Sequence, residues 1–286
     1  MSELVGTNEE PALRRQEPAP PLYFDGRREL AAHYLFGQGL EIGALHLPLA
    51  VPDDVVVKYV DRLTVAQLRN DYPELADCTL VEADIIDNGE ILSTVADGSQ
   101  DFIVANHFLE HCEDPIAAIQ NHLGKLREGG ILFYAVPDKR YTFDWPRPVT
   151  SLEHMIADHE GGPERSRSEH YEEWARFVEI RSGETNEQTI ARARQLERDA
   201  YSIHMHVWTQ VEFLQLVLAA RERCGRAFDI EAAARQDIEF MVVLRKCGAL
   251  PPARPEPPTD VPQARSLRAR VRSRLGRLAR RVGLRR

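Results

Sequence analysis

Polar residues that could do chemistry follow five short apolar runs in this 286-residue sequence. Runs of this kind are typical of buried parallel strands. An open α/β sheet binds its ligands beyond the carboxyl ends of its strands. The residues directly after the runs are therefore the first candidates for a binding site, and they are Gly43–His46, Asp61–Arg62, Asp84–Ile85, Asn106–His111 and Asp138–Arg140.

Two of these positions carry an acid that could recognise an adenosine. Asp61, which ends VVVKYVD, could accept hydrogen bonds from both ribose hydroxyls. Asp84, in VEADIID, could accept from the adenine amino group while Ile85 offers apolar surface to the ring. Each acid could equally cap a helix or a loop. Gly43 either lets the backbone approach a ligand closely or makes a tight turn, and the absence of a GxGxxG motif counts against NAD.

Histidines and one further acid near the same strand ends could act as general bases. His107 follows the fourth run, and Asp138 follows the fifth, where it could be a base, a metal ligand or a cap. His204 and His206 lie in YSIHMHVWT, and extended backbone would place both imidazoles on one face. Such a pair could bind a metal or work as base and partner, but it is more often structural when no third ligand is recognisable. We therefore assign no metal.

Strands alternating with helices must position these residues. Periodicity and helix caps predict helices at 64–70, from Asp114 to the Gly129–Gly130 turn, and from Thr209 to Gly225. The pattern predicts an α/β fold with a doubly wound, mostly parallel sheet of seven strands and an antiparallel edge formed by the last two. The strands are expected at 39–43, 55–60, 79–83, 101–106, 131–136, 228–232 and 238–246.

Composition divides the chain into four parts. Residues 1–22 are polar and proline-rich and are expected to form a mobile arm, and residues 23–250 are expected to form the folded domain. Within that domain the polar, helix-prone segment 139–203 interrupts the alternation, and we expect a helical lid over the strand ends. A proline-rich linker at 251–260 leads to a basic tail at 261–286.

The charge of the chain is unevenly distributed. The formal net charge is −9, but the tail holds ten of the 36 basic residues and no acid. The other 26 stand against all 45 acids, so residues 1–260 carry −19 on the same counting, which argues against nucleic acid as a partner. The tail could form a basic amphipathic helix that contacts a membrane surface or a partner, or it could only solubilise the chain. Its apolar residues at helical spacing are Leu267, Val271, Leu275, Leu278 and Val282.

The sequence lacks the signals of export and of zinc knuckles. It has no run of about 18 apolar residues and no apolar stretch of signal-peptide type near its start. Its four cysteines form no CxxC. We expect a cytoplasmic protein, with peripheral contact at the inner membrane surface through the tail as an alternative.

The segment DFIVANHFLEHCEDP, with the downstream LREGGILFYAVPD, closely resembles the class I S-adenosylmethionine-dependent methyltransferases. The likeness is to the branch whose fourth strand runs into an LEHxxDP segment, as in bacterial proteins of glycan and secondary-metabolite clusters. The order and spacing of the strand-end motifs fit over residues 39–138, and the final helix and two strands fit the C-terminal half of the family. The resemblance implies a Rossmann-like methyltransferase sheet and S-adenosylmethionine as cofactor.

The resemblance also implies residue roles. One departure from the family is that Ala44, Leu45 and His46 stand where a second glycine usually follows Gly43. The segment after the fourth strand usually lines the cofactor pocket in this family. The implied cofactor contacts are Glu41, Gly43, Ala44, Asp61, Arg62, Asp84, Ile85, Asn106 and His107.

An oxygen nucleophile needs a base or a metal, and imidazoles that could serve as the base lie near the predicted strand ends. We therefore expect methylation of a hydroxyl, and the resemblance implies that the hydroxyl belongs to a glycan or small molecule. The candidate bases are His204, His206, His107 and Asp138, and the expected substrate contacts are His111, Arg140 and Tyr141. A non-catalytic methyltransferase-like binding protein is the first alternative, favoured by the altered loop after Gly43. An NAD-dependent oxidoreductase is the less favoured second alternative.

Overall fold

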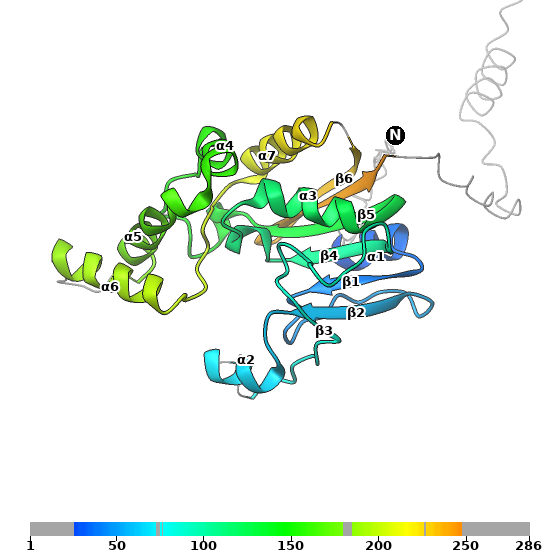
Figure 1. The fold of residues 1–286 in the computed structure, drawn as a ribbon, viewed down its shortest axis with the longest axis horizontal. Coiled ribbons are helices and arrows are strands. Elements are labelled where there is room, and N and C mark those ends of the chain that lie inside the picture. The colour runs from blue at the N-terminus through cyan, green and yellow to red at the C-terminus, as the bar shows by residue number, and fades with distance from the viewer. Residues whose placement is uncertain (1–25, 73–74, 76, 180–184, 226, 248–286) are drawn as a thin grey trace, which may run out of the picture. The chain divides into compact units, whose positions relative to one another are not determined.

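The computed structural model describes residues 26–72, 75, 77–179, 185–225 and 227–247. They form a seven-stranded sheet with the order β3-β2-β1-β4-β5-β7-β6 (Figure 1). The strands β1 to β5 run parallel, and β7 pairs antiparallel with β5 and with β6. Their bounds are β1 Gln38–Ile42, β2 Val56–Asp61, β3 Ile85–Ile86, β4 Gln100–Asn106, β5 Leu126–Pro137, β6 Phe228–Gln236 and β7 Glu239–Lys246.

Helices cover both faces of this sheet. Apolar residues of α3 and α7 pack on one face, and those of α1 pack on the other. This confirms the predicted doubly wound, mostly parallel sheet with an antiparallel edge. The helices are α1 Gly26–Tyr34, α2 Val65–Asp71, α3 Pro115–Lys125, α4 Leu152–Gly161, α5 Arg167–Phe177, α6 Asn186–Arg198 and α7 Gln210–Arg223, with short 3-10 turns η2 Leu109–His111, η3 Lys139–Tyr141 and η4 Pro163–Arg165.

The central strands are buried on both faces, which explains their continuous apolar sequences. In β4, Ile103 and Ala105 face α3 and α7, whereas Phe102 and Val104 face α1. Successive side chains of a strand point to opposite faces, so each such strand supplies both cores. The sheet is consequently rigid where its carboxyl ends carry polar residues.

Helix caps behave as the sequence predicts. The Asp114 side chain accepts a hydrogen bond from the Ala117 amide at 2.8 Å, with Pro115 as the first helical residue of α3. Thr209 and Glu212 form the predicted capping box at the start of α7. These caps satisfy amides that have no partner inside the helix.

The third strand was predicted in the wrong place. Residues 79–83 form no strand, and β3 is confined to Ile85–Ile86. The Val81 amide donates to the carbonyl of Leu45 in the loop after β1, so this apolar run packs beside that loop and does not join β2. A run of apolar residues indicates that a segment is buried, but it does not distinguish a strand of the sheet from a segment that packs beside a loop. The sequence also did not predict α1, and β5 begins five residues before the predicted start at 131.

The segment 139–203 contains η3, α4, η4, α5 and α6. Figure 1 shows α5 and α6 beyond the ends of the strands toward which β1 and β4 point. Part of this segment has an apolar cluster of its own, separate from the two cores of the sheet, formed by Tyr171, Trp174, Ala175, Ala193, Leu196, Ile203 and Met205.

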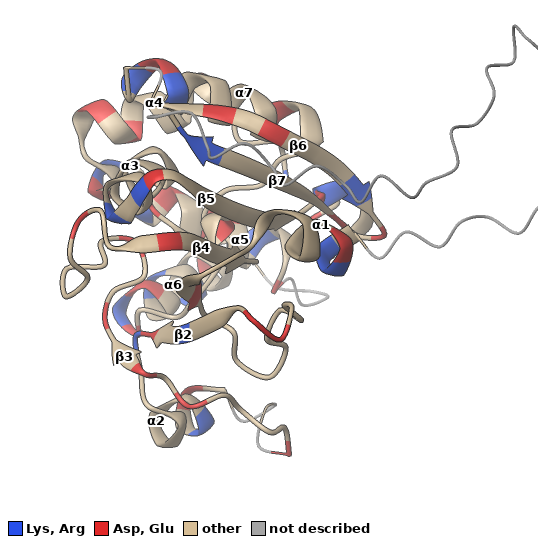
Figure 2. Cartoon of the chain, turned by 90° about the vertical axis from the view of Figure 1, so that its right-hand side faces the viewer, with Lys and Arg blue, Asp and Glu red and all other residues tan. Residues whose placement is uncertain are grey.

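Charge is interspersed on the surface that the structure describes. In Figure 2 α1 carries both basic and acidic residues, whereas the charged residues of α4 are all acidic. None of the described helices has the length and apolarity needed to cross a membrane. The predicted arm at 1–22, the linker at 251–260 and the basic tail at 261–286 lie outside the described residues.

Candidate functional site

Three predicted cofactor residues lie side by side at one edge of the sheet. In the strand register, Ile42 of β1 is paired with Val60 of β2 and with Ala105 of β4. The next residues are Gly43, Asp61 and Asn106. These are the carboxyl ends of parallel strands, where α/β sheets bind ligands.

The backbone after β1 is open toward solvent. Gly43 has a φ of +66°, and a Cβ built on it would meet no atom within 4 Å. Leu45 also has a positive φ, +49°, which is rare for a residue with a side chain. Open space over a left-handed glycine is what close approach of a ligand to the backbone requires. Ala44 is half-buried in the same turn.

Glu41 shapes this loop from below. Its carboxylate is buried and accepts two hydrogen bonds from the Leu49 amide, at 2.9 and 3.1 Å. Burial raises the pKa of Glu41 to about 7, against the lowering effects of the Leu49 amide and of Arg27. In this structure Glu41 therefore holds the 43–49 loop in place.

Glu41 predicts a dependence of stability on pH. Its pKa is about 7 in the folded chain and near 4.5 in the unfolded one, so the folded state holds the proton more tightly. The stabilisation is complete below pH 4.5 and is lost as the pH rises through 7, which corresponds to about 2 to 3 kcal/mol. We expect urea unfolding without cofactor to show this loss between pH 5 and 8 in the wild type and a much smaller loss in Glu41→Gln. An equal pH slope in both proteins would contradict the assignment.

Asp61 is half-buried at the end of β2, and its Oδ1 accepts from the Leu63 amide at 3.1 Å. Burial raises the pKa of Asp61, and backbone hydrogen bonds together with Arg62 oppose the rise. The Arg62 guanidinium contacts Tyr72 Oη at 3.2 Å and Asp71 at 3.5 Å, at the end of α2. Arg62 therefore lies against α2, whereas Asp61 stays at the strand edge.

Asp84 lies before β3 and is exposed, with its Oδ2 accepting from the Tyr59 amide at 2.8 Å. Ile85 is half-buried against the core. The acid at the carboxyl end of β3 is Asp87, whose oxygens accept from Asn88, Ser93 and Thr94. Burial would raise the pKa of Asp87, but these hydrogen bonds outweigh it and lower the pKa to about 2. Asp87 thus organises the 88–94 loop, and the adenine contact of Asp84 stays a prediction.

Unpaired polar atoms mark the same edge. Both amide atoms of the Asn106 side chain and Nδ1 of His46 are buried without a hydrogen-bond partner. A buried polar group without a partner costs about 1–3 kcal/mol, so such groups usually meet a ligand or water. These atoms, together with the open backbone at Gly43, fit a polar cofactor at this edge.

His107 follows Asn106 with a φ of +50°. Its Nε2 lies 2.7 Å from Glu239 Oε2, and its Nδ1 lies 3.5 Å from Glu110 Oε1. Burial lowers the pKa of His107, but the two carboxylates outweigh burial and the pKa is raised. Arg27 binds the same Glu239. Both ring nitrogens face carboxylates of the chain, so neither is directed at a substrate proton, and the structure therefore disfavours His107 as a general base.

His204 has the geometry of an oriented base. Its Nδ1 lies 2.7 Å from Asp144 Oδ2, and Asp144 Oδ1 accepts from Arg147 at 3.0 Å. Burial would raise the pKa of Asp144, but the contacts with His204 and Arg147 lower it, so this carboxyl is ionised. A carboxylate on Nδ1 fixes the tautomer and leaves Nε2 free to accept a proton.

Glu110 and His111 lie beside that imidazole. One ligating atom from each of Glu110, His111 and His204 lies within 4.8 Å of the others. Glu110 is fully buried, neither of its oxygens has a hydrogen bond, and burial raises its pKa against the effect of His204. His111 Nδ1 contacts the Ile203 carbonyl at 2.9 Å, and burial lowers its pKa to about 3. His111 is therefore a neutral, anchored side chain.

Asp138, another candidate base, has both of its carboxylate oxygens engaged. Both carboxylate oxygens of Asp138 accept hydrogen bonds from the Arg140 side chain, at 2.9 and 2.6 Å. Burial would raise the pKa of Asp138, but Arg140 outweighs it and lowers the pKa. Of the open alternatives for Asp138, the structure favours the cap, because Asp138 also accepts from the Arg140 amide. Tyr141 stacks under Arg235, whose guanidinium carbon lies 4.2 Å from the ring centre.

His206 does not join His204, contrary to the prediction of a pair. Its Nε2 contacts the Glu113 carbonyl at 3.2 Å, and its ring packs near His154 and His170. His204 binds Asp144, whereas His206 binds the Glu113 carbonyl. The expectation that extended backbone brings the two imidazoles together as a pair is therefore wrong. Burial and His170 lower the pKa of His206 to about 3. The His206 ring has no exposed surface, whereas His204 keeps 9% exposure, which disfavours His206 as a base for a substrate.

Sequence reasoning missed Glu110, Asp144 and Glu239. Glu110 lies inside the LEH motif and could have been noticed there, but Asp144 and Glu239 are distant in sequence from their histidines. A cavity of about 190 Å³ lies elsewhere, over the amino-terminal halves of β1 and β2, and is lined by residues that include Gln38, Val56 and Lys58. Most of its lining lies toward the other end of the strands, although Ile85, a predicted cofactor contact, is also part of that lining.

Comparison with known proteins identifies the family. The chain matches the model of the methyltransferase domain over residues 37–217, which is more than half of its length. A search of curated proteins finds no match. Among solved structures, the chain is similar to the CurJ carbon methyltransferase, with 12% identity, 75% of this chain and 50% of that chain covered, and a TM-score of 0.38.

Two further structures resemble it to a comparable degree. The first is a SAM-dependent methyltransferase from Aquifex aeolicus, with 11% identity, 73% of this chain and 81% of that chain covered, and a TM-score of 0.38. The second is one from Methanosarcina mazei, with 17% identity, 77% and 96% covered, and a TM-score of 0.42. The family match rests on the sequence over residues 37–217, the same region that carries the strand-end site. The chain belongs to the methyltransferase domain family and is an S-adenosylmethionine-dependent methyltransferase.

Proposed function

We propose that this enzyme methylates a hydroxyl oxygen of a glycan or small molecule, with His204 as general base. The observation that carries the proposal is the His204–Asp144 pair, with Nδ1 and Oδ2 at 2.7 Å. An alcohol needs such a base, because its own pKa is far above neutrality. A carbon or nitrogen acceptor that is already nucleophilic would not require the pair.

The chemistry assigns one step to each group. S-adenosylmethionine held at the Gly43, Asp61 and Asn106 edge would supply an electrophilic methyl group to the acceptor oxygen and would leave as S-adenosylhomocysteine. His204 Nε2 takes the hydroxyl proton, and Asp144 stabilises the imidazolium that forms. Asp144 is a positioning residue, held in turn by Arg147.

Exposed aromatic side chains next to the base favour a ring-shaped acceptor. Tyr141, Phe143 and Trp145 are 48%, 54% and 69% exposed, directly after β5. The Phe143 ring centre lies 5.1 Å from that of His204. Aromatic faces bind apolar ring surfaces, while neighbouring polar groups fix their orientation. Arg140, which is also exposed, provides such a polar group at the same place.

Incubation with methyl-labelled S-adenosylmethionine tests the proposal. The purified enzyme is offered sets of glycans and phenolic or alcoholic small molecules, and labelled products are assigned by mass spectrometry and NMR. We expect the label in a methyl ether. A label on nitrogen or carbon would overturn the hydroxyl assignment. Binding of S-adenosylhomocysteine in a calorimeter without turnover of any acceptor, including those in cell extracts, would support the non-catalytic alternative.

A further inference from the structure

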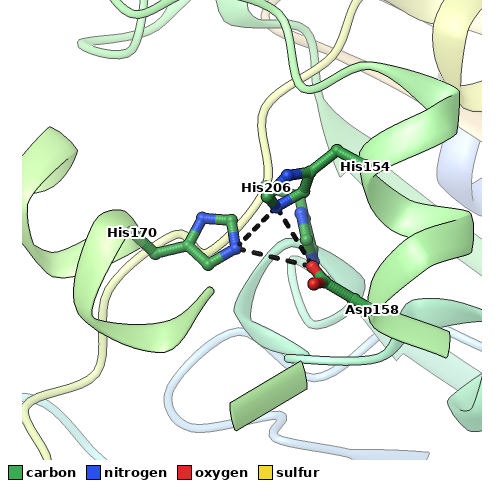
Figure 3. Close-up of side chains that lie close together, drawn as sticks. All are labelled: His154, Asp158, His170 and His206. Atoms are coloured by element: carbon green, nitrogen blue, oxygen red, sulfur yellow. Dashed lines mark hydrogen bonds and ion pairs between the residues drawn. The ribbon is translucent and has the colours of Figure 1, made fainter. Parts of the chain in front are cut away.

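Three histidines and one aspartate converge between α4, α5 and the extended segment before α7 (Figure 3). His154 and Asp158 lie four residues apart on α4 and therefore share a face. His170 projects from α5, and His206 comes from the extended segment. One ligating atom from each of the four lies within 4.8 Å of the others.

The distances inside this cluster match the edges of a coordination tetrahedron. His154 Nε2 lies 3.1 Å from His170 Nε2 and 3.1 Å from Asp158 Oδ2, and His170 Nε2 lies 3.7 Å from that same oxygen. Bonds of about 2.0–2.1 Å from a central zinc ion to nitrogen and oxygen place neighbouring ligand atoms about 3.3 Å apart. Three of the four groups are thus already near the spacing that a bound ion would impose, and the His206 nitrogen lies within 4.8 Å of them.

Hydrogen bonds outside the cluster orient two of the ligands. His206 can donate its Nε2 proton to the Glu113 carbonyl at 3.2 Å, which leaves the Nδ1 lone pair free. The Ser166 hydroxyl donates to Asp158 Oδ1 at 2.7 Å, which leaves Oδ2 for the cluster. Partners of this kind fix the tautomer and rotation of metal ligands.

The cluster is only partly satisfied by hydrogen bonds among the residues that the structure describes, since His154 Nε2 and His170 Nε2 pair with each other at 3.1 Å. Asp158 Oδ2 and His206 Nδ1 are both buried without a hydrogen bond, although Asp158 Oδ2 lies close to two imidazoles. Asp158, His170 and His206 are buried, and His154 is half-buried. Unpaired atoms in such a place are costly, and one cation would satisfy all four lone pairs at once.

The surrounding charges permit a divalent cation. Arg147 lies near the cluster, but its guanidinium binds Asp144 at 3.0 Å and Glu173 at 2.8 Å, so its charge is compensated. Three imidazoles and one carboxylate form a nitrogen–oxygen donor set that suits zinc in a closed structural site.

We propose that His154, Asp158, His170 and His206 bind one zinc ion in tetrahedral coordination. The ion ties α4 and α5 to the segment that carries His204 two residues before His206. The site is structural, because all four positions of the tetrahedron are filled by the protein. It thereby orders the part of the insertion that positions the proposed base, without touching the substrate.

Zinc binding to the purified full-length chain tests this proposal without any assay of methyl transfer. We expect about one zinc per chain by elemental analysis after dialysis, a rise in melting temperature when zinc is added to chelator-treated protein, and the visible spectrum of tetrahedral cobalt on substitution with Co²⁺. His154→Ala is the main variant, because His154 is the most exposed ligand, and it should weaken zinc binding by at least about 100-fold. Ser166→Ala should weaken it by about 10–100-fold.

His159→Ala is the matched control on the same helix. His159 contacts Asp114 at 2.9 Å and lies outside the cluster, so its variant should bind zinc as the wild type does. Absence of zinc from the wild type, with no change in melting temperature on addition, would overturn the proposal and leave a hydrogen-bonded histidine cluster. The proposal would also be overturned if His159→Ala lost as much affinity for zinc as His154→Ala.

Discussion

Replacement of His204 by Asn is expected to lower kcat by about 10²- to 10⁴-fold, the range that a positioned general base contributes. Asn keeps a polar group beside Asp144 but cannot take the proton of the acceptor. The Michaelis constant for S-adenosylmethionine should change little, because the contacts that the structure gives His204 are with Asp144 and with neighbouring aromatic rings and do not include Gly43 or Asp61. Steady-state kinetics with a methyl acceptor identified by the labelling experiment measure both constants.

Two further variants separate catalysis from folding. His33 is exposed on α1, which packs on the other face of the sheet. The His33→Asn variant should therefore retain full kcat. Asp144→Asn should lower kcat and shift the pH profile, because the ionised Asp144 carboxylate stabilises the protonated imidazole. An unchanged kcat in His204→Asn would exclude His204 as the base. A loss of kcat that only parallels a fall in melting temperature would assign His204 to structure.

Replacement of Asp61 by Ala should weaken cofactor binding by at least about 100-fold and leave the fold intact. Two hydrogen bonds from ribose hydroxyls to a carboxylate contribute about 1.5–3 kcal/mol each, and the variant removes both acceptors. The fold should tolerate the change, because this carboxylate accepts its hydrogen bond from the Leu63 amide, only two residues away in the chain. Titration calorimetry with S-adenosylhomocysteine measures the affinity, and circular dichroism checks the fold.

The control for this experiment is Asp53→Ala. Asp53 is an exposed acid in the loop before β2 and makes the same change of charge away from the strand ends. Its affinity for S-adenosylhomocysteine should equal that of the wild type. If Asp61→Ala bound as tightly as Asp53→Ala, the ribose contact would have to be assigned to another residue.

Most of the sheet could be predicted because its order depends on local patterns. Continuous apolar runs mark strands buried on both faces, and Asp114–Pro115 and Thr209–Glu212 mark helix starts through hydrogen bonds between residues close in sequence. The strand predicted at 79–83 is absent because that segment is buried by a contact that is not local. That run is apolar because it packs beside the loop after β1, a contact between segments about 35 residues apart that no local pattern encodes.

The candidate site divides in the same way. The sequence by itself determined the family, the edge of the sheet where the cofactor residues lie, and the strand-end positions of Gly43, Asp61 and Asn106, because parallel strands place all their carboxyl ends together. It also indicated His204 as a candidate base, but His206 lies only two residues away, and the sequence alone does not show which of the two histidines has a partner that orients it as a base.

The tertiary structure alone decided which partners each histidine side chain contacts. Asp144 contacts His204 from 60 residues away in the sequence, and Glu239 contacts His107 from 132 residues away, so the partners of these imidazoles are pairs that sequence spacing does not reveal. His206 meets His154, Asp158 and His170 only because α4 and α5 fold back on the segment before α7. Strand ends follow from backbone geometry that repeats locally, whereas the pKa values and ligand sets of buried side chains depend on partners brought together by the whole fold.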